Sequence, residues 1–417
     1  MPDLGSRTGA GSNYPALRYE TRPMAAPPRP LRTLVERYNP EVLDVPRRGA
    51  RIRLEISDDG AWDVLLDSEG ARLVEPDGAP QALLSADAAT WRAVAVDLRG
   101  GMDAFRARRL TVRHNLHLGV GLLAATSGMT EPGRLEFASV RTRVGTISTL
   151  QAGTGDPIVA VPGLGGTKVS FLPTVAALAG EFRVIALDLP GFGDSDKPLG
   201  AAYDAAYFAR AVVALLDSLE LERVHLVGNS MGGRVTLEVG LRHPERVRRL
   251  VLLSSSLAWR RERPWATLLR FVRPELGLFQ VAPRGVVEGI VRRMIPGAES
   301  GWAAAGVDEF LRAYLTPRGR AAFYAAARHI YMEEPEGDNG FWPRLRTLEP
   351  PALFVWGLRD RLVPVAFARH VTDALPNAEH VELDCGHVPQ LERPRETHAA
   401  MARFLRAGAR ATPGARG

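Results

Sequence analysis

The chain has 417 residues, a length that predicts two or three domains. Hydrophobic residues make up 46% of it and charged residues 24%, an ordinary globular composition that excludes a disordered, collagen-like or fibrous chain. The single cysteine, Cys385, excludes a disulfide framework and a multi-thiolate metal site, and suits the reducing cytoplasm, where we expect the protein. The net charge of +6 comes with acidic residues interspersed along the chain, and no nucleic-acid-binding module is visible, so no nucleic-acid partner is expected.

The N-terminal third combines a proline-rich start with one small α+β unit. Residues 1–30 are rich in Gly, Pro, Ser and Arg and are predicted to form a disordered tail. Within residues 31–128, apolar and polar residues alternate at 52–56 and again at 62–66 around an Asp-Asp-Gly turn, which predicts a β-hairpin. The other predicted elements of this unit are helices over 32–38, 88–98 (capped by Asp87) and 116–125, and strands at 73–74, 81–84 and 109–113.

Two runs near the end of this unit carry a resemblance to a known family. They are Gly101-Met102-Asp103-Ala104-Phe105 and Arg109-Leu110-Thr111-Val112-Arg113-His114-Asn115-Leu116. With the order of the predicted elements, they make residues 31–128 similar to the sterol-carrier-protein-2-like lipid-binding fold. The resemblance implies a sheet-and-helix tunnel that holds an acyl chain or a sterol. A packed accessory domain without a ligand is the alternative.

From residue 136 to about residue 408, the pattern changes to strands that alternate with helices. Nearly continuous apolar runs rich in β-branched residues are typical of strands buried on both faces of a parallel sheet. These runs lie at 157–161, 182–187, 223–227, 249–253 and 352–356. Helical stretches such as 205–219 and 231–242 separate them, so the sequence predicts a doubly wound α/β sheet.

Residues 257–345 interrupt this alternation of strands and helices. They carry many aromatic residues and arginines at amphipathic helical spacing, broken by prolines. We therefore predict a helical lid inserted over the sheet. A helical subdomain packed elsewhere on the molecule is the alternative.

The run Gly228-Asn229-Ser230-Met231-Gly232-Gly233 gives the strongest indication of chemistry. It lies between a predicted strand and a predicted helix, which is the context of a Gly-x-Ser-x-Gly nucleophile elbow. Small residues flank the serine because the turn is tight, and the strained backbone lifts the hydroxyl clear of the sheet edge. Ser230 is therefore the candidate nucleophile.

A serine hydroxyl is a weak nucleophile and needs an adjacent base that is held in one tautomer. Asp360 and His387 follow Ser230 in the chain order Ser…Asp…His, and each lies in a loop just after a predicted strand. Open α/β sheets place their sites at such carboxyl ends. We predict that Asp360 orients His387 and that His387 exchanges a proton with Ser230. No cofactor and no metal ion is expected.

A fourth run, Asp188-Leu189-Pro190-Gly191-Phe192-Gly193-Asp194-Ser195, completes a resemblance of residues 136–408 to the α/β-hydrolase superfamily. The resemblance implies an oxyanion hole that is built from the backbone amide of Met231 and that of Leu164, in the loop after the strand at 157–161. It also implies that epoxide hydrolases and haloalkane dehalogenases of this fold use an aspartate at the elbow. Ser230 therefore favours acyl transfer to water.

These features predict a serine hydrolase that cleaves carboxylic esters through an acyl-enzyme intermediate. The apolar, arginine-bearing lid and the predicted lipid-carrier domain favour lipid or long-chain acyl esters, with transient contact between the lid and a membrane surface. Three alternatives stay open: a hydrolase of carbon–carbon bonds in ring-fission products, an acyl thioesterase, and a non-enzymatic lipid-binding module.

Overall fold

The computed structural model describes residues 26–96 (apart from 44, 47, 58 and 68), 104, 109–126, 135–259, 273–279, 283, 285–289 and 301–407. Most of the predicted N-terminal tail and most of the run at 101–105 lie outside these ranges. Helix α1 (Arg29–Glu36) begins before the predicted start at Arg32. Pro30 lies in its first turn, where a missing backbone N–H costs no hydrogen bond. Residues 29 and 30, which the sequence analysis placed in the disordered tail, are therefore helical.

A five-stranded sheet follows α1 in the chain. Its strand order is β3-β2-β1-β4-β5, in which β1 and β4 are parallel and the other neighbours antiparallel. The strands are β1 (Ala50–Ile56), β2 (Gly60–Asp67), β3 (Gly70–Val74), β4 (Ala82–Ala86) and β5 (Leu110–Arg113). The predicted hairpin is confirmed as β1 and β2, with Leu54 opposite Trp62.

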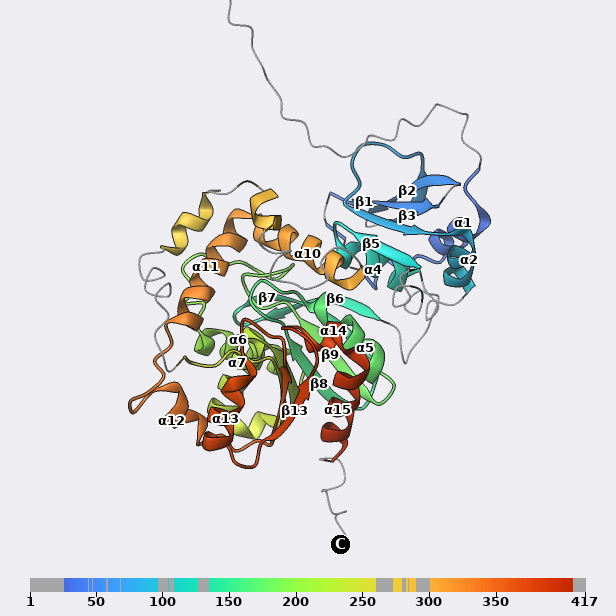
Figure 1. Cartoon of the computed structure of the whole chain (residues 1–417). Helices are drawn as coiled ribbons and strands as arrows, with labels where there is room; N and C mark the ends of the chain where they lie inside the picture. The colour runs from blue at the N-terminus through green and yellow to red at the C-terminus, as the bar shows by residue number, and fades with distance from the viewer. Residues whose placement is uncertain are drawn as a thin grey trace, which may run out of the picture.

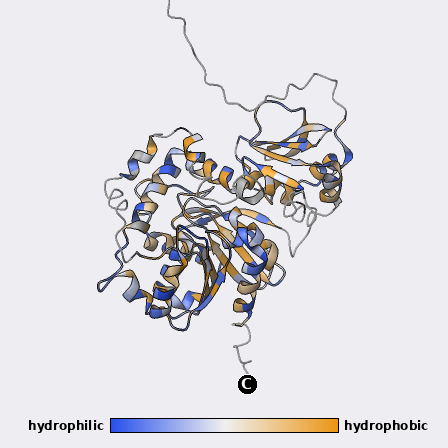
Figure 2. Cartoon of the chain, viewed as in Figure 1, coloured by the Kyte–Doolittle hydropathy of each residue, from blue (hydrophilic) through white to orange (hydrophobic). Residues whose placement is uncertain are grey.

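Three helices cover one face of this first sheet (Figure 1). They are α1, α2 (Ala88–Val96) and α4 (Leu116–Ala125). The predicted cap of α2 is confirmed, because the Thr90 amide donates a hydrogen bond to Asp87 Oδ1 at 2.6 Å. Helix α4 has the predicted bounds, and every one of its residues is buried. Figure 2 shows it as one of the most apolar helices of the molecule.

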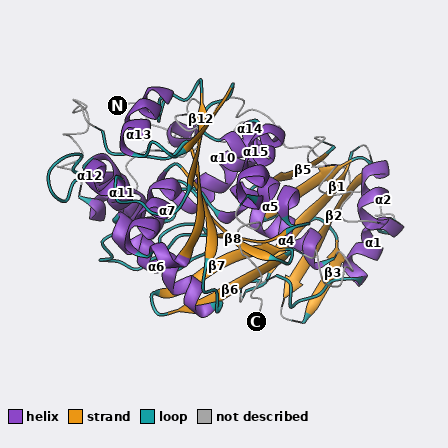
Figure 3. Ribbon diagram, turned by 90° about the horizontal axis from the view of Figure 1, so that it is seen from below, coloured by secondary structure: helices purple, strands orange, loops and turns teal. Residues whose placement is uncertain are grey.

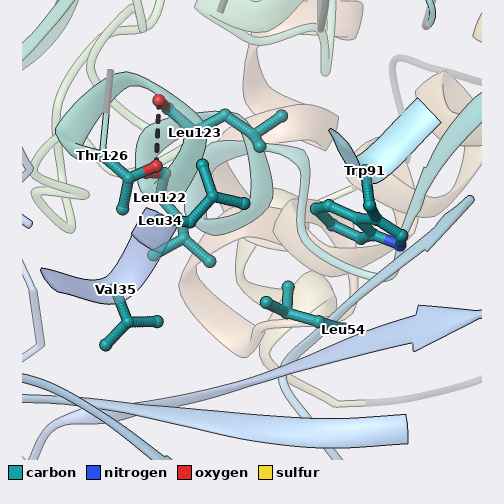
Figure 4. A pocket seen from close by; sticks show the side chains of 7 residues that line it. All are labelled: Leu34, Val35, Leu54, Trp91, Leu122, Leu123 and Thr126. Carbon is teal, nitrogen blue, oxygen red and sulfur yellow. Dashed lines mark hydrogen bonds between the residues drawn. The ribbon is translucent and has the colours of Figure 1, made fainter. Parts of the chain in front are cut away.

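A small apolar void lies between these helices and the sheet (Figure 4). The side chains that line it are Leu34, Val35, Leu54, Trp91, Leu122, Leu123 and Thr126. Thr126 is their one polar member, and its hydroxyl donates a hydrogen bond to the Leu122 carbonyl at 2.9 Å. As it stands, the void leaves no room for a water molecule.

The second sheet has eight strands in the order β13-β12-β11-β10-β8-β9-β7-β6. The neighbours from β13 to β9 are parallel, as predicted, whereas β7 is antiparallel to both β9 and β6. The strands are β6 (Glu136–Thr142), β7 (Gly145–Ala152), β8 (Asp156–Val161), β9 (Phe182–Leu187), β10 (Val224–Asn229), β11 (Val247–Leu253), β12 (Ala352–Gly357) and β13 (Glu379–Leu383). The hairpin of β6 and β7 is an addition that the sequence reasoning did not identify.

Helices lie on both faces of the eight-stranded sheet, so the sheet is doubly wound (Figure 3). The helices are α5 (Leu172–Leu178), α6 (Ala205–Ser218), α7 (Met231–Arg242), α13 (Ala368–Ala374), α14 (Pro389–Glu392) and α15 (Pro394–Arg406), with short 3-10 turns η1 (Lys168–Phe171), η2 (Pro244–Arg246) and η4 (Val365–Phe367). Alternate strand residues pack on opposite faces. Val159 packs in one apolar cluster with α6 and α7, and Ile158 in another with α5 and α15.

The segment predicted to form a lid lies between β11 and β12. Its described elements are η3 (Pro274–Leu278), a helical turn at 285–289, α10 (Gly301–Tyr314), α11 (Pro317–Tyr331) and α12 (Phe341–Leu345). Figure 1 shows α10 between the N-terminal sheet and the larger sheet. Within the described ranges, no helix is both long and apolar enough to cross a bilayer.

Candidate active site

Ser230 occupies a tight turn between β10 and α7. Its backbone has φ of 53° and ψ of −119°, a conformation that costs free energy for any residue with a side chain. Two glycines make the turn possible: a Cβ atom on Gly228 would collide with the Gly232 carbonyl, and a Cβ on Gly232 with the Val161 carbonyl. The Ser230 amide donates a hydrogen bond to the Leu253 carbonyl at 3.0 Å, which ties the turn to β11.

Asp360 and His387 lie side by side in the loops after β12 and β13. His387 Nδ1 and Asp360 Oδ2 are 2.8 Å apart, and the Asp360 side chain is fully buried. The other oxygen, Asp360 Oδ1, accepts hydrogen bonds from the amides of Leu362 and Val363 at 2.8 and 3.0 Å. Because both carboxylate oxygens are engaged, the group is held in one orientation toward the imidazole.

The loop that carries His387 is fixed from two sides. Glu392 accepts hydrogen bonds from the amides of Gly386 and Val388, at 2.7 and 3.0 Å. The side-chain amide of Asn229 donates to the His387 carbonyl at 3.1 Å and to the Leu253 carbonyl at 2.9 Å. Asn229 directly precedes Ser230, so it joins the elbow to the histidine loop. The sequence reasoning assigned no role to Asn229 or Glu392.

The Ser230 hydroxyl points to a partner that the sequence reasoning missed. Its oxygen lies 3.4 Å from Ser256 Oγ, and the Ser256 amide donates a hydrogen bond to the Ser230 carbonyl at 3.0 Å. Among the described residues, the hydroxyl makes its hydrogen bond with Ser256 and not with His387. Three consecutive serines after the strand at 249–253 were the available signal in the sequence.

Both predicted oxyanion-hole residues border the elbow. Met231 is the first residue of α7 and is buried, while Leu164 lies in the loop after β8. A Cβ built on Gly163 of that loop would lie 3.2 Å from Ser230 Cβ, so the loop passes directly over the serine. Gly165 has φ of 71°, and a Cβ there would collide with Phe310 of α10. The loop is therefore enclosed between the elbow and α10.

The loop at 188–195 has a structural role. Lys168 is fully buried, and its ammonium lies 2.7 Å from Asp188 Oδ2 and 3.0 Å from Asp194 Oδ2. Burial alone would lower the pKa of Lys168, but the two carboxylates hold it above its usual value. Ser195 Oγ donates to the Asp188 carbonyl at 2.7 Å and accepts from the Ser148 amide at 2.8 Å. No group of three His, Cys, Asp or Glu side chains suited to a metal ion occurs in the part of the chain that the structure describes.

The molecule combines an eight-stranded doubly wound sheet, a serine at a strand–turn–helix elbow and a histidine–aspartate pair on the neighbouring loops. Together these features define the α/β class of hydrolases. A family model of the alpha/beta hydrolase fold matches residues 156–394, and the chain belongs to this family. The predicted fold is thereby confirmed. The N-terminal sheet precedes the matched residues.

Relatives and solved structures agree with this family. The chain is 32% identical over 267 residues to the dihydrolipoyllysine-residue acetyltransferase component of the acetoin cleaving system of Pseudomonas putida, and spans 64% of that protein and 60% of its own length. It is 29% identical over 296 residues to a 2-hydroxy-6-oxononadienedioate/2-hydroxy-6-oxononatrienedioate hydrolase of Paraburkholderia xenovorans, covering 67% of this chain and 98% of the relative. A solved membrane phospholipase A, described as a bacterial virulence factor, aligns with a TM-score of 0.56 at 29% identity, over 66% of this chain and 87% of that one.

Proposed function

We propose that the chain is a serine hydrolase that cleaves carboxylic esters. The observation that carries the proposal is the placement of Ser230 in a strained elbow that Asn229 ties to the loop of His387, whose imidazole is hydrogen-bonded to Asp360. An imidazole held in one orientation by a carboxylate is the base that activates a serine hydroxyl for attack on a carbonyl.

The proposed reaction has two halves. Ser230 Oγ attacks the ester carbonyl while His387 takes the hydroxyl proton, and the imidazolium returns that proton to the departing alcohol. Water then attacks the acyl-enzyme with His387 again as the base; the carboxylic acid leaves, and the imidazolium returns the proton to Ser230 Oγ. Asp360 keeps Nδ1 protonated, so that Nε2 is free to act. The Ser230 hydroxyl turns from Ser256 toward His387 by rotation about its Cα–Cβ bond before attack.

Negative charge develops on the carbonyl oxygen during both attacks. We assign its stabilisation to the backbone amides of Met231 and Leu164, which border the elbow from α7 and from the loop after β8. One such donor is worth about 3–4 kcal/mol of the barrier. Because these donors are backbone groups, their position follows from the conformations of the elbow and of the loop after β8.

Lipid or long-chain acyl esters are the substrate class that we propose. Three aromatic rings of α10 and α11, those of Phe310, Tyr314 and Phe323, pack together beside Gly165. Phe279 and Val286 of the lid segment expose 70% and 53% of their surface, which suits brief contact with a membrane surface. The similarity to a membrane phospholipase A supports the same substrate class.

A second candidate is hydrolysis of carbon–carbon bonds in ring-fission products. Relatives that match over most of their length are named as such hydrolases, for example a 2-hydroxymuconate semialdehyde hydrolase of a Pseudomonas species, at 29% identity over 88% of its length. Cleavage of a vinylogous 1,5-diketone in the absence of ester turnover would select this candidate over the ester hydrolase.

The proposed substrate class is tested by turnover of p-nitrophenyl esters from acetate to palmitate. We expect kcat/KM to rise with acyl length. Ser230→Ala should lower kcat about a million-fold at every length, because the nucleophile is gone. Ser218→Ala, at an exposed serine at the end of α6, is the matched control and should leave turnover unchanged. Equal turnover by Ser230→Ala and the parent would exclude the mechanism.

We also propose that the N-terminal unit takes up an acyl chain, as its resemblance to the sterol-carrier-protein-2-like fold implies. The apolar lining of the void between α1, α2 and α4 supports this proposal, although the void must widen to admit a chain. The test is the binding of a fluorescent fatty acid to the parent protein and to Leu34→Trp. Saturable binding that is weaker in Leu34→Trp would support the proposal, and binding that the substitution leaves unchanged would contradict it.

We propose a cytoplasmic location on the basis of the one free, buried cysteine, Cys385.

A further inference from the structure

Helix α10 contacts both the N-terminal unit and the proposed catalytic loop. It lies beside β5 and α4 in Figure 1, and successive residues of its second half face different parts of the molecule. Asp308 and Glu309 reach the N-terminal unit, Phe310 reaches the loop after β8, and Arg312 reaches the loop at 188–195. One rigid helix therefore joins three segments that are distant in the sequence.

The contact with the N-terminal unit is an ion pair with a buried carboxylate, Asp308, and a partly exposed arginine, Arg113. Arg113, the last residue of β5, donates from Nε to Asp308 Oδ2 at 2.6 Å and from Nη2 to Oδ1 at 3.3 Å. The amide of His114 donates to the same carboxylate at 3.2 Å, and His114 adopts a left-handed φ of 70° to do so. The Asp308 side chain is only 7% exposed. Burial alone would raise the pKa of Asp308, but the hydrogen bonds from Arg113 and His114 hold it below its usual value.

A second contact lies one residue along the helix. Glu309 Oε2 accepts a hydrogen bond at 3.3 Å from the amide of Leu116, the first residue of α4. Glu309 is also paired at 2.6 Å with Arg312, which donates to Asp194 at 2.9 Å. Asp194 lies 3.3 Å from His117 Nδ1 of α4. The N-terminal unit, α10 and the catalytic domain are thus joined by hydrogen bonds and ion pairs that run from Leu116 through Glu309 and Arg312 to Asp194.

The opposite contact of α10 is with the loop that carries Leu164. The Phe310 ring leaves no space for a Cβ on Gly165. Two ring contacts fix the position of Phe310: it stacks on Tyr314 with the ring centroids 5.4 Å apart, and it meets Phe323 edge-on with the centroids 5.8 Å apart. If α10 shifted, the Phe310 ring would move away from Gly165, and the loop would lose the contact that holds it on this side. Asp308 and Phe310 are two residues apart, so both contacts move together.

We propose that Arg113 and Asp308 are positioning residues for the reaction, through which the N-terminal unit holds α10, and with it Phe310, against the loop that supplies the second oxyanion donor. The inference rests on the proposed function of that loop. It makes the N-terminal unit a structural part of the catalytic site, in addition to any role in binding an acyl chain. Without Arg113, the buried Asp308 carboxylate loses its cation, and without the Asp308 charge, α10 loses its ionic attachment to β5; either change favours movement of the helix over retention of its position.

The test compares Asp308→Asn, Arg113→Asp, Asp308→Arg and the double charge exchange in the full-length protein. Active sites are counted by labelling with a fluorophosphonate, and kcat is given per labelled site. Each single variant should lower kcat by about 10- to 100-fold with a smaller change in KM, because a displaced oxyanion donor acts on the transition state. The double exchange should recover a large part of kcat. Arg143→Asp, which breaks the exposed pair with Asp217, is the matched control and should keep the parent kcat.

Two outcomes would overturn the inference. One is an unchanged kcat per labelled site in Asp308→Asn. The other is a loss of activity that follows the labelled fraction alone, which would mean that the pair serves folding only. A readout independent of activity is amide hydrogen exchange over residues 162–166, which should quicken in Asp308→Asn and not in Arg143→Asp. If the parent protein takes no label, the proposed function fails, and this exchange measurement decides the positioning role by itself.

Discussion

The chemistry of the site depends on how single residues are held. Ser230 keeps an unfavourable backbone conformation because the Ser230 amide is bonded to Leu253 and its carbonyl to the amide of Ser256. The sequence predicted the elbow because glycines at 228 and 232 are required there by contact with backbone carbonyls. It could not predict Ser256 as the partner of the hydroxyl, since that contact depends on the register of β10 against β11, in which Asn229 lies opposite Leu253.

Asp360→Asn tests the orientation of the imidazole. The asparagine can still accept the amides of Leu362 and Val363, but its NH₂ group would face His387 Nδ1 and favour the tautomer that cannot act as base at Nε2. We expect kcat on p-nitrophenyl esters to fall about 10⁴-fold with the fold retained. Asp373→Asn, at an exposed position of α13, is the control. A loss smaller than about tenfold would remove Asp360 from the mechanism.

Whole elements were predicted best where burial is continuous. The parallel strands β8 to β12 were found from uninterrupted apolar runs, and α7 was found with both of its ends. The hairpin of β6 and β7 escaped because buried positions in it are polar: Ser148 and Thr149 are 3% and 2% exposed. Ser148 donates its amide to Ser195 Oγ, a long-range contact that no local pattern shows.

Two glycine substitutions test how closely elements approach each other. Gly232→Ala should lower the free energy of unfolding by about 3 kcal/mol, because its Cβ would meet the Val161 carbonyl of β8 and push α7 away. Gly306→Ala in α10 has open space around the new Cβ and should raise stability by up to about 1 kcal/mol through helix propensity. Chemical denaturation measures both, and equal effects of the two substitutions would contradict the packing described for the elbow.

At the scale of the whole molecule, the N-terminal unit and the catalytic domain share one apolar cluster. It runs from α1 and the first sheet through Phe137 to Ile158 of β8 and Phe404 of α15. The sequence predicted two units on either side of residues 128–136, from a change of pattern. The sequence could not predict that the apolar residues of the two units pack in one cluster. Amphipathic patterns show which face of an element is buried but not which element it packs against.

Two buried histidines make stability depend on pH. Burial lowers the pKa of His225 to about 4 and that of His398 to about 4, from an ordinary value of 6.5. Between pH 4 and pH 6.5 these histidines bind protons in the unfolded chain but not in the folded chain. Their contribution to the free energy of unfolding is therefore fully present above pH 6.5 and is lost as the pH falls toward 4. Each histidine contributes a loss of about 3 kcal/mol over this window. Urea unfolding should show this fall, and His398→Gln should reduce it; a pH-independent unfolding free energy would contradict the burial of both rings.

The central claim is that Ser230 is an activated nucleophile. The most direct measurement is labelling of the full-length protein with a fluorophosphonate, followed by identification of the modified peptide. We predict one adduct, on Ser230, that forms in parallel with the loss of ester turnover and is absent from Ser230→Ala. The absence of any adduct, or an adduct on another residue while turnover is lost, would contradict the account.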